Sequence, residues 1–531
     1  MADELWRMSA VEAVARLRKR EISPLELVEA SARRIGEVEP AVNALPTLCL
    51  DRARDHARRI MQGGAACEAA GEPGWLAGLP VSIKDLTDVA GVRTTYGSPL
   101  FADHVPAKSH PLVLRIERHR DGQVEHTGIR RRGSTFNEVF GRTRNPWNTS
   151  LTSGGSTGGG AVSVATGEVW LAQGSDHGGS LRGPGSHCSV VGLRPSPGRV
   201  TRGTVGNLWS QLSVQGPMAR NVADLALFLD TMAGFCPLDP LTFDAPAISF
   251  SDGLARPAAP RRVAFTPDYN GRMPIDREVR QICTRAARRF EELGCIVEEA
   301  SPDIGAADEA FQILRSQHFV VDRELQLRSH RDVWNTERGL GQTPSDIARA
   351  ERERPAFYRR VVEFFGTYDL LVTPGAPTPA FDVNLRNAPT VGGQKLDNYM
   401  GGSTLTAVIT LSACPAMAVP CGFDQFGRPV GLQLVGRPRG EAALLQAALL
   451  FEQLLGLDRL LPIDPEAGLG SAGDLNPIRC LTCLQSPDLP KSDRTKQSRR
   501  VPCCCVVSGC RSSTTSSRHS ATSPRRHPSG T

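Results

Sequence analysis

Apolar and polar positions along the chain follow the two periods of regular secondary structure. Short apolar runs that end in loops predict buried strands at 79–83, 262–265, 295–297, 370–374, 416–420 and 431–436. Capping sequences and a 3.6-residue apolar period predict helices that begin after Ser9 and after Ser23, and further helices over 277–293 and 441–455. Strands that alternate with helices in this way are typical of an α/β fold with a mainly parallel or mixed sheet.

Three other stretches have a weaker pattern. Residues 145–206 are rich in glycine, serine and threonine between short apolar runs, so we expect loops threaded through a core. Over residues 261–368 we expect strand and helix to alternate. Residues 476–531 are rich in serine, arginine, proline and cysteine and have no periodicity, which predicts a disordered tail.

Composition and charge narrow the class of protein. Hydrophobic residues make up 40% of the 531, enough for a sizeable core, and no run of about eighteen apolar residues predicts a membrane helix. Residues 1–14 do not resemble a signal peptide, so we expect a cytoplasmic protein with no membrane contact. The net charge of +6 arises in the tail, where residues 478–531 hold ten Lys/Arg against two Asp/Glu, a net +8 that leaves −2 for the rest. We therefore expect no nucleic-acid partner.

Cysteine spacing gives no support for a metal site. Six of the fourteen cysteines lie in the tail, and Cys480 and Cys483 have the spacing of metal ligands. No second pair at that spacing and no nearby histidine accompany them, so we expect no metal ion. The other eight are scattered singly, as buried thiols in a reducing compartment are.

Three motifs carry candidate chemistry. They are GLPVSIKD at 78–85, GGSTGGG at 154–160, and GSDHGGSLR at 174–182 followed by VGLRPS at 191–196. Taken singly, Lys84 could be a solvated lysine, the glycines a turn, and Ser180 a helix cap or part of an anion site. No Gly-Lys-Ser/Thr follows the glycines, which excludes a P-loop.

In this order and spacing, the motifs resemble the amidase signature family. The signature core lies at 145–199 with Lys84 upstream, and a looser resemblance covers about residues 5–465. The resemblance implies one large α/β domain over 1–475, in which helices cover both faces of a mixed central β-sheet. It also implies a small-molecule amide as the substrate and no cofactor.

The resemblance assigns a role to each motif residue. Ser180 matches the nucleophile, Ser156 the bridging serine that the family holds on a cis peptide bond, and Lys84 the general base. The backbone N–H groups of four consecutive residues match the oxyanion hole: His177, Gly178, Gly179 and Ser180. Gly155, Asp176 and Arg182 match supporting positions around this loop.

These residue types suit the hydrolysis of a carboxylic amide. A serine hydroxyl is a weak nucleophile and needs an adjacent base. A lysine can be that base only when it is neutral, which burial favours. Lys84 would accept a proton from Ser156, and Ser156 would accept one from Ser180 as it attacks the carbonyl carbon. Glycines at 178 and 179 let backbone N–H groups point at the developing oxyanion.

The sequence departs from the family pattern at four positions near the motifs. Thr157 stands in place of a second serine, and His177 stands where the family usually has a small or apolar residue. We expect both to be tolerated. His187 and Ser189 stand in place of an aromatic residue and a glycine, and we expect them to loosen the packing beneath the nucleophile loop.

A larger departure lies within 118–132. Residues 122–130, GQVEHTGIR, stand where the family has an apolar strand and a Gly-Lys-Ser-Asn-x-x-Glu-Phe motif. The nucleotide string CAAGTCGAACACACCGGAATTCGG encodes Gln-Val-Glu-His-Thr-Gly-Ile-Arg from its first base and Lys-Ser-Asn-Thr-Pro-Glu-Phe from its second. Our hypothesis is a local frameshift, restored at 134–137, with the tail after 478 of the same origin; resequencing the gene tests it. A shifted segment predicts the loss of a core strand and favours an inactive relative.

Two further interpretations concern other enzymes. The glutamine-hydrolysing subunit of an amidotransferase shares the fold and the triad of the resemblance, and the catalytic core does not separate it from a free amidase. An α/β-hydrolase would use Gly154–Gly158 as its nucleophile elbow, but the polar stretch 148–152 is not the apolar strand that this elbow requires. The sequence does not decide whether the chain forms a homo-oligomer.

Overall fold

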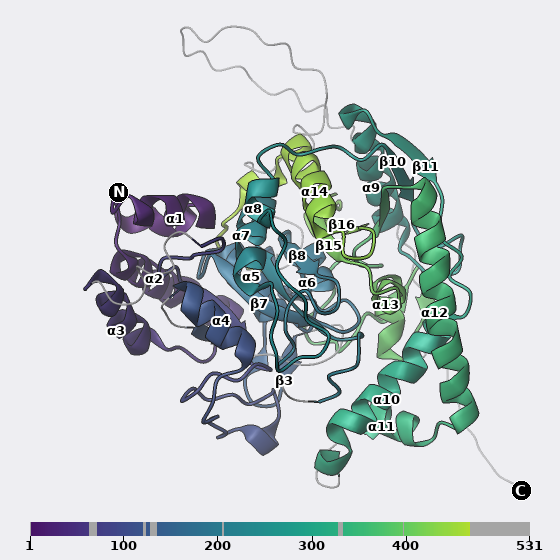
Figure 1. The fold of residues 1–531 in the computed structure, drawn as a ribbon, viewed down its shortest axis with the longest axis horizontal. Coiled ribbons are helices and arrows are strands. Elements are labelled where there is room, and N and C mark those ends of the chain that lie inside the picture. The colour runs from purple at the N-terminus through teal and green to yellow at the C-terminus, as the bar shows by residue number, and fades with distance from the viewer. Residues whose placement is uncertain are drawn as a thin grey trace, which may run out of the picture. The chain divides into compact units, whose positions relative to one another are not determined.

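A mixed ten-stranded β-sheet runs through the protein (Figure 1). Its strands lie in the order β11-β10-β12-β16-β15-β8-β9-β7-β1-β2. The computed structural model describes residues 2–62, 72–120, 124–127, 135–203, 206–327, 333–396 and 398–467. All of them belong to one compact unit, Met1–Gly470. The strands pair in parallel at the two ends of the sheet and antiparallel in its middle, so the predicted mixed sheet is confirmed.

The strands are short, and most of their described residues are buried. The sheet is formed by β1 (Val81–Lys84), β2 (Val124–Thr127), β7 (Leu171–Asp176), β8 (Val191–Arg194), β9 (Val214–Ala219), β10 (Arg262–Phe265), β11 (Ile296–Glu299), β12 (Leu370–Pro374), β15 (Ala416–Phe423) and β16 (Pro429–Val435). Three small ribbons pair β3 (Phe136–Asn137) with β4 (Gly141–Arg142), β5 (Arg144–Asn145) with β6 (Asn148–Thr152), and β13 (Thr390–Val391) with β14 (Gln394–Lys395).

Helices lie between and around these strands. They are α1 (Ala10–Arg18), α2 (Pro24–Val42), α3 (Leu50–Met61), α4 (Pro111–Arg120), α5 (Gly158–Thr166), α6 (Arg182–Cys188), α7 (Val222–Met232), α8 (Phe250–Gly253), α9 (Arg277–Arg288), α10 (Ala307–Leu327), α11 (Val333–Leu340), α12 (Pro344–Thr367), α13 (Thr404–Leu411) and α14 (Glu441–Leu455). None of the helices in the described part of the chain is both long and apolar enough to cross a bilayer.

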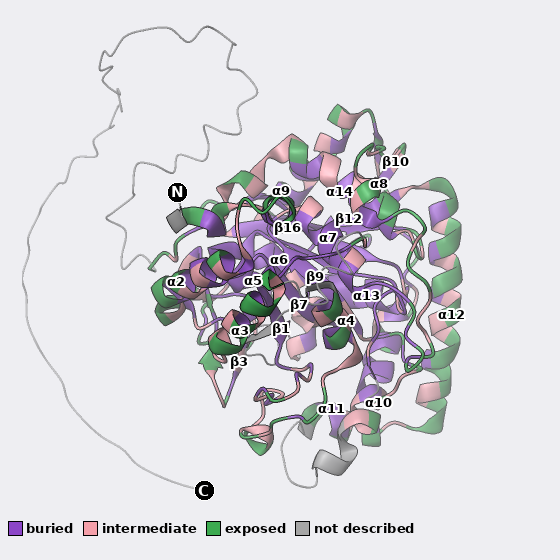
Figure 2. Ribbon diagram, turned by 60° about the vertical axis from the view of Figure 1, so that its left-hand side comes forward, coloured by how far each residue is buried: buried purple, intermediate pink, exposed green. Residues whose placement is uncertain are grey.

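Strand side chains alternate between two hydrophobic cores, one on each face of the sheet. In β12, Leu370 and Val372 pack with α7, α9 and α14, whereas Leu371 packs on the opposite face with α10, α12 and α13. In β7, Ala172 packs with α5 in a further cluster. Helices therefore cover both faces, and the buried residues follow the sheet (Figure 2).

The structure confirms the predicted strands and helices and corrects two regions. Ser23 and Glu26 form the capping box of α2, and the helix predicted over 277–293 is α9 followed by a 3₁₀ turn, Arg289–Leu293. The expectation of loops over 145–206 is wrong in part, because this stretch also forms β6, α5, β7, α6 and β8. The expected alternation over 261–368 is also wrong in part, because α10, α11 and α12 follow one another without a strand between them.

The segment of the frameshift hypothesis contains a strand. Val124–Thr127 forms β2 at the sheet edge, in parallel register with Val81–Lys84 of β1. A strand therefore stands at this place, at the edge of the sheet, and the frameshift hypothesis stays a prediction. Residues 121–123, 128–134 and the tail from 468 lie outside the described residues, so the predicted tail and the domain boundary at 475 stay predictions.

Candidate active site

The candidate active site lies at one edge of the sheet, where β1 and β7 end side by side. The two strands are parallel neighbours, with Val81 opposite Leu171, so their carboxyl ends meet at the same edge. Lys84 is the last residue of β1, and Ser180 lies between the end of β7 and the start of α6. Ser156 precedes α5. The topology therefore brings three motifs that are far apart in the sequence to one place.

Lys84 joins two of these motifs. Its side chain is fully buried, and Nζ donates hydrogen bonds to Ser156 Oγ at 2.9 Å and to Thr157 Oγ1 at 2.8 Å, with Ser175 O at 3.5 Å. Its backbone N–H donates to Gln173 Oε1 at 3.0 Å, which anchors the end of β1 to β7. Burial of a lysine favours the neutral form that a general base requires.

Ser156 and Ser180 line the same cavity. The peptide bond between Gly155 and Ser156 is cis. The N–H of Thr157 donates to the carbonyl oxygen of Ser180 at 3.1 Å, which ties the two loops together. Among the described residues, no hydrogen bond joins the two serine hydroxyls.

Three residues of the loop 177–180, His177, Gly178 and Ser180, line the cavity. The N–H of Gly179 donates to Asp176 Oδ1 at 2.9 Å. In the described part of the chain, the N–H groups of His177, Gly178 and Ser180 donate to no protein atom, which leaves them available to an oxyanion. Gly179 has φ +117°, and a Cβ there would lie 2.2 Å from Thr406 Oγ1, so this position requires glycine.

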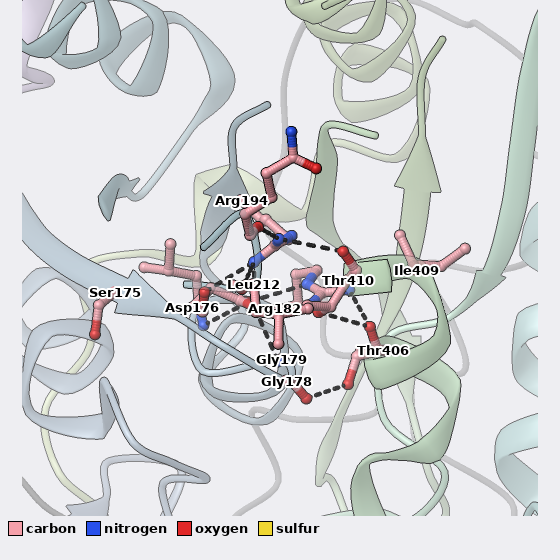
Figure 3. Close-up of polar contacts among 12 residues, drawn as sticks. Ser175, Asp176, Gly178, Gly179, Arg182, Arg194, Leu212, Thr406, Ile409 and Thr410 are labelled. Atoms are coloured by element: carbon pink, nitrogen blue, oxygen red, sulfur yellow. Dashed lines mark hydrogen bonds and ion pairs between the residues drawn. The ribbon is translucent and has the colours of Figure 1, made fainter. Parts of the chain in front are cut away.

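A buried charge cluster braces this loop from behind (Figure 3). Arg182 forms two hydrogen bonds to the Asp176 carboxylate, from Nε at 3.0 Å and from Nη2 at 2.8 Å, and also donates to the carbonyl oxygen of Thr406 at 2.8 Å. Arg194 donates to the Asp176 carbonyl oxygen at 2.8 Å. Burial alone would raise the pKa of the Asp176 carboxyl, but Arg182 and then Arg194 outweigh burial and hold the pKa below its usual range. The carboxylate therefore stays charged.

Thr406 connects this loop to α13. Its Oγ1 donates to the carbonyl oxygen of Gly178 at 2.8 Å, and its own carbonyl oxygen accepts from Arg182 (Figure 3). The loop is therefore held both from β7 through Asp176 and from α13 through Thr406. Sequence reasoning did not find Thr406, because nothing in its local pattern distinguishes it from other threonines in an apolar helix.

The structure shows the surroundings of three residues that depart from the family pattern: Thr157, His187 and Ser189. Thr157, expected only to be tolerated, accepts a hydrogen bond from Lys84. His187 is buried, and burial lowers its pKa to about 4 despite the contact of Nε2 with Thr378 O, so the ring is neutral. Ser189 ends α6 in the left-handed region, with φ 57°. That conformation explains why a glycine would suit the position.

A cavity of about 580 Å³ opens beside the loop 177–180. Ser156, Ser180, His177 and Gly178 line one side, and residues of α10 line another. Burial, followed by electrostatic interactions with His318 and Arg315, holds the pKa of His177 well below its usual range. The imidazole of His177 at the cavity wall is therefore neutral. The described residues include no cluster of His, Cys, Asp or Glu suited to a metal ion.

The chain is similar to known amidases and amidotransferase subunits over most of its length. The Amidase family model matches residues 26–445. A glutamyl-tRNA(Gln) amidotransferase subunit from Moorella thermoacetica is 34% identical over 489 residues, which cover 85% of this chain and 97% of the relative. An acylamidase of Rhodococcus erythropolis is 32% identical over 457 residues, covering 84% and 95%.

A solved structure agrees with this likeness. The crystal structure of a bacterial aryl acylamidase of the amidase signature family has a TM-score of 0.77, with 26% sequence identity over 86% of this chain and 99% of that one. The match in fold thus extends over the sheet and the helices that surround the site. On the family match and these relatives, the chain belongs to the Amidase family, the amidase signature enzymes.

Proposed function

We propose that the chain is an amidase that hydrolyses a carboxylic amide to an acid and ammonia or an amine through an acyl-enzyme on Ser180. The observation that carries the proposal is the buried contact of Lys84 Nζ with Ser156 Oγ, at 2.9 Å, at the wall of the cavity that Ser180 also lines. A buried lysine beside a serine hydroxyl is a means of activating a nucleophile without a metal ion.

Acylation transfers one proton along the three residues. Ser180 Oγ bonds to the carbonyl carbon, its proton passes to Ser156, and the Ser156 proton passes to neutral Lys84. The tetrahedral intermediate collapses, the C–N bond breaks, and the proton returns through Ser156 to the leaving nitrogen. Water then attacks the acyl-enzyme, gives its proton to the same relay, and releases the acid as the proton returns to Ser180.

The N–H groups of His177, Gly178 and Ser180 are the donors that support an oxyanion hole. They have no protein acceptor among the described residues. One such donor contributes about 3–4 kcal/mol to the stabilisation of a tetrahedral oxyanion. The Gly179 N–H, named with them from the sequence, instead donates to Asp176, so its proposed part is to hold the loop.

A second candidate is a glutamine-hydrolysing subunit that works with partners. The name of the Moorella thermoacetica relative favours it, because that protein is an amidotransferase subunit. Both candidates use the same nucleophile. They differ in whether the purified chain alone turns over simple amides.

The test is ammonia or amine release from a panel of small aliphatic amides, aryl amides and glutamine, by the full chain and by Ser180→Ala. We expect turnover that falls at least about 1,000-fold in Ser180→Ala. Turnover of glutamine only when partner subunits are added would favour the second candidate. Folded protein that cleaves none of these substrates, with or without partners, would contradict both and favour an inactive relative.

A further inference from the structure

One face of α10 borders the cavity beside the nucleophile loop. Phe311, Arg315, His318, Phe319 and Asp322 recur at helical spacing, and the last four line the cavity. A Cβ on Gly178 would lie 3.3 Å from Phe311 Cζ, so the helix touches the loop directly. The ring of His177 lies 4.7 Å from that of His318. This face is therefore within reach of a substrate bound at Ser180.

Arg315 stands out on this face because, within the described part of the chain, it is a buried cation without a carboxylate partner. Its side chain is only 7% exposed. Nη1 donates to Asn335 Oδ1, and Nη2 donates to the Tyr399 hydroxyl at 2.5 Å, both of which are neutral acceptors. The guanidinium also lies over the ring of Phe319, 4.7 Å from its centre. No acidic side chain of the described residues forms an ion pair with it.

The other charged groups that line the cavity have polar partners among the described residues. Asp322 lies 2.9 Å from His318 Nε2 and also faces Arg202. Arg202 Nη1 donates to two backbone carbonyl oxygens, of Asn207 and Ser210, at 2.8 Å each. Asp88 accepts from the Tyr96 hydroxyl at 2.6 Å. Arg315 is thus the buried charge among the described lining residues that lacks a counter-charge.

A buried charge without a partner costs several kcal/mol. Such an arginine is retained where a ligand supplies the missing anion. A guanidinium has five N–H donors in a planar fork, and two of those of Arg315 donate to protein acceptors. The free donors match the two oxygens of a carboxylate. Asn335 and Tyr399 also bond to each other, at 2.8 Å, so the guanidinium is held in place before a ligand arrives.

We infer that Arg315 binds a carboxylate of the substrate, so that the preferred substrate is an amide whose acyl part carries a second, ionised carboxyl group, as in the half-amides of dicarboxylic acids. This inference rests on the proposed amidase function. Arg315 would select the substrate and orient its carbonyl toward Ser180, and the apolar ring of Phe319 would flank the carbon chain between the two ends.

The test compares matched amides that differ in the charged group. Succinamate is paired with butyramide, and glutaramate with pentanamide, and kcat/KM is measured for each. We expect at least one anionic amide to exceed its neutral partner about 100-fold, the range for a buried charge pair. In Arg315→Met that ratio falls toward one, whereas Arg315→Lys retains part of it. Arg338→Met, the same change on α11 away from the cavity lining, leaves the ratio as in the wild type.

Equal turnover of neutral and anionic amides by the wild type would overturn the inference and leave the proposed function standing. A preference that survives Arg315→Met would overturn it as well. If no amide is cleaved, the binding of anionic ligands to the protein still tests the role of Arg315. Glutarate and succinamate should raise the melting temperature of Ser180→Ala but not that of Ser180→Ala/Arg315→Met, and an equal shift in both proteins would contradict the assignment.

Discussion

Lys84 and Thr157 are joined by a hydrogen bond of 2.8 Å from Nζ to Oγ1, next to the 2.9 Å bond from the same nitrogen to Ser156. Thr157 therefore helps to aim the lysine at Ser156. Its hydroxyl also donates to the carbonyl oxygen of Ser175 at 3.2 Å, which fixes its own direction.

Thr157→Val should lower kcat about 10-fold with little change in KM, because it removes one hydrogen bond that positions the base and leaves the cavity wall otherwise unchanged. Steady-state kinetics on any amide that the wild type cleaves would measure this. Thr157→Ser restores a hydroxyl and should recover most of the activity. Equal activity of the valine and serine variants would contradict the positioning role.

Replacing the base should have a larger effect. Lys84→Met should lower kcat/KM about 100- to 10,000-fold, because proton transfer by a placed general base contributes a factor of that size. Lys395→Met, a change at an exposed lysine of β14, serves as the control.

The buried pair of Asp176 and Arg182 should contribute to stability in a pH-dependent way. Asp176→Asn should lower the free energy of unfolding by about 3–5 kcal/mol, because it leaves buried arginine charge without its carboxylate. Denaturant unfolding at pH 7 measures this loss. An unchanged midpoint would show that the ion pair does not support the fold.

The sign of the pH dependence follows from the lowered pKa of Asp176. The unfolded chain has the ordinary aspartate pKa of about 3.9, so the stabilisation is fully present above that pH and is lost as the pH falls toward the lower folded-state pKa. The free energy of unfolding of the wild type should therefore fall more steeply with acidification below about pH 4 than that of Asp176→Asn. Parallel curves for the two proteins would contradict the assignment.

Ser189 offers a test in the stabilising direction. Because this serine holds φ 57° at the end of α6, Ser189→Gly should raise the free energy of unfolding by about 0.5–1 kcal/mol. Ser189→Ala keeps the Cβ and should not raise the free energy of unfolding. A glycine variant less stable than the wild type would show that the serine side chain stabilises the turn.

The sequence allowed the fold class and the site motifs to be predicted because both rest on local patterns. Apolar runs predicted the buried strands, and the family resemblance carried by the order and spacing of three motifs led to Lys84, Ser156 and Ser180. The contact of Lys84 with Ser156 joins residues 72 positions apart, so only the family resemblance, and no local pattern, predicted it.

Other features depend on tertiary contacts that the sequence does not encode locally. Helical periodicity can indicate that Phe311 and Arg315 share a face of α10, but not that this face borders a cavity. The role of Thr157 depends on where the Lys84 amino group lies in the folded protein. The edge strand β2 forms from a polar segment, because pairing with β1 satisfies its backbone groups whatever its side chains are.

The most direct test of the central claim is to locate the acyl group on the protein. The full chain is mixed with a slowly hydrolysed activated amide or ester, quenched in acid, digested, and analysed by mass spectrometry. The account predicts an acyl adduct on the peptide that contains Ser180, absent in Ser180→Ala and strongly reduced in Lys84→Met. An adduct on another residue, or undiminished amide turnover by Ser180→Ala, would contradict it.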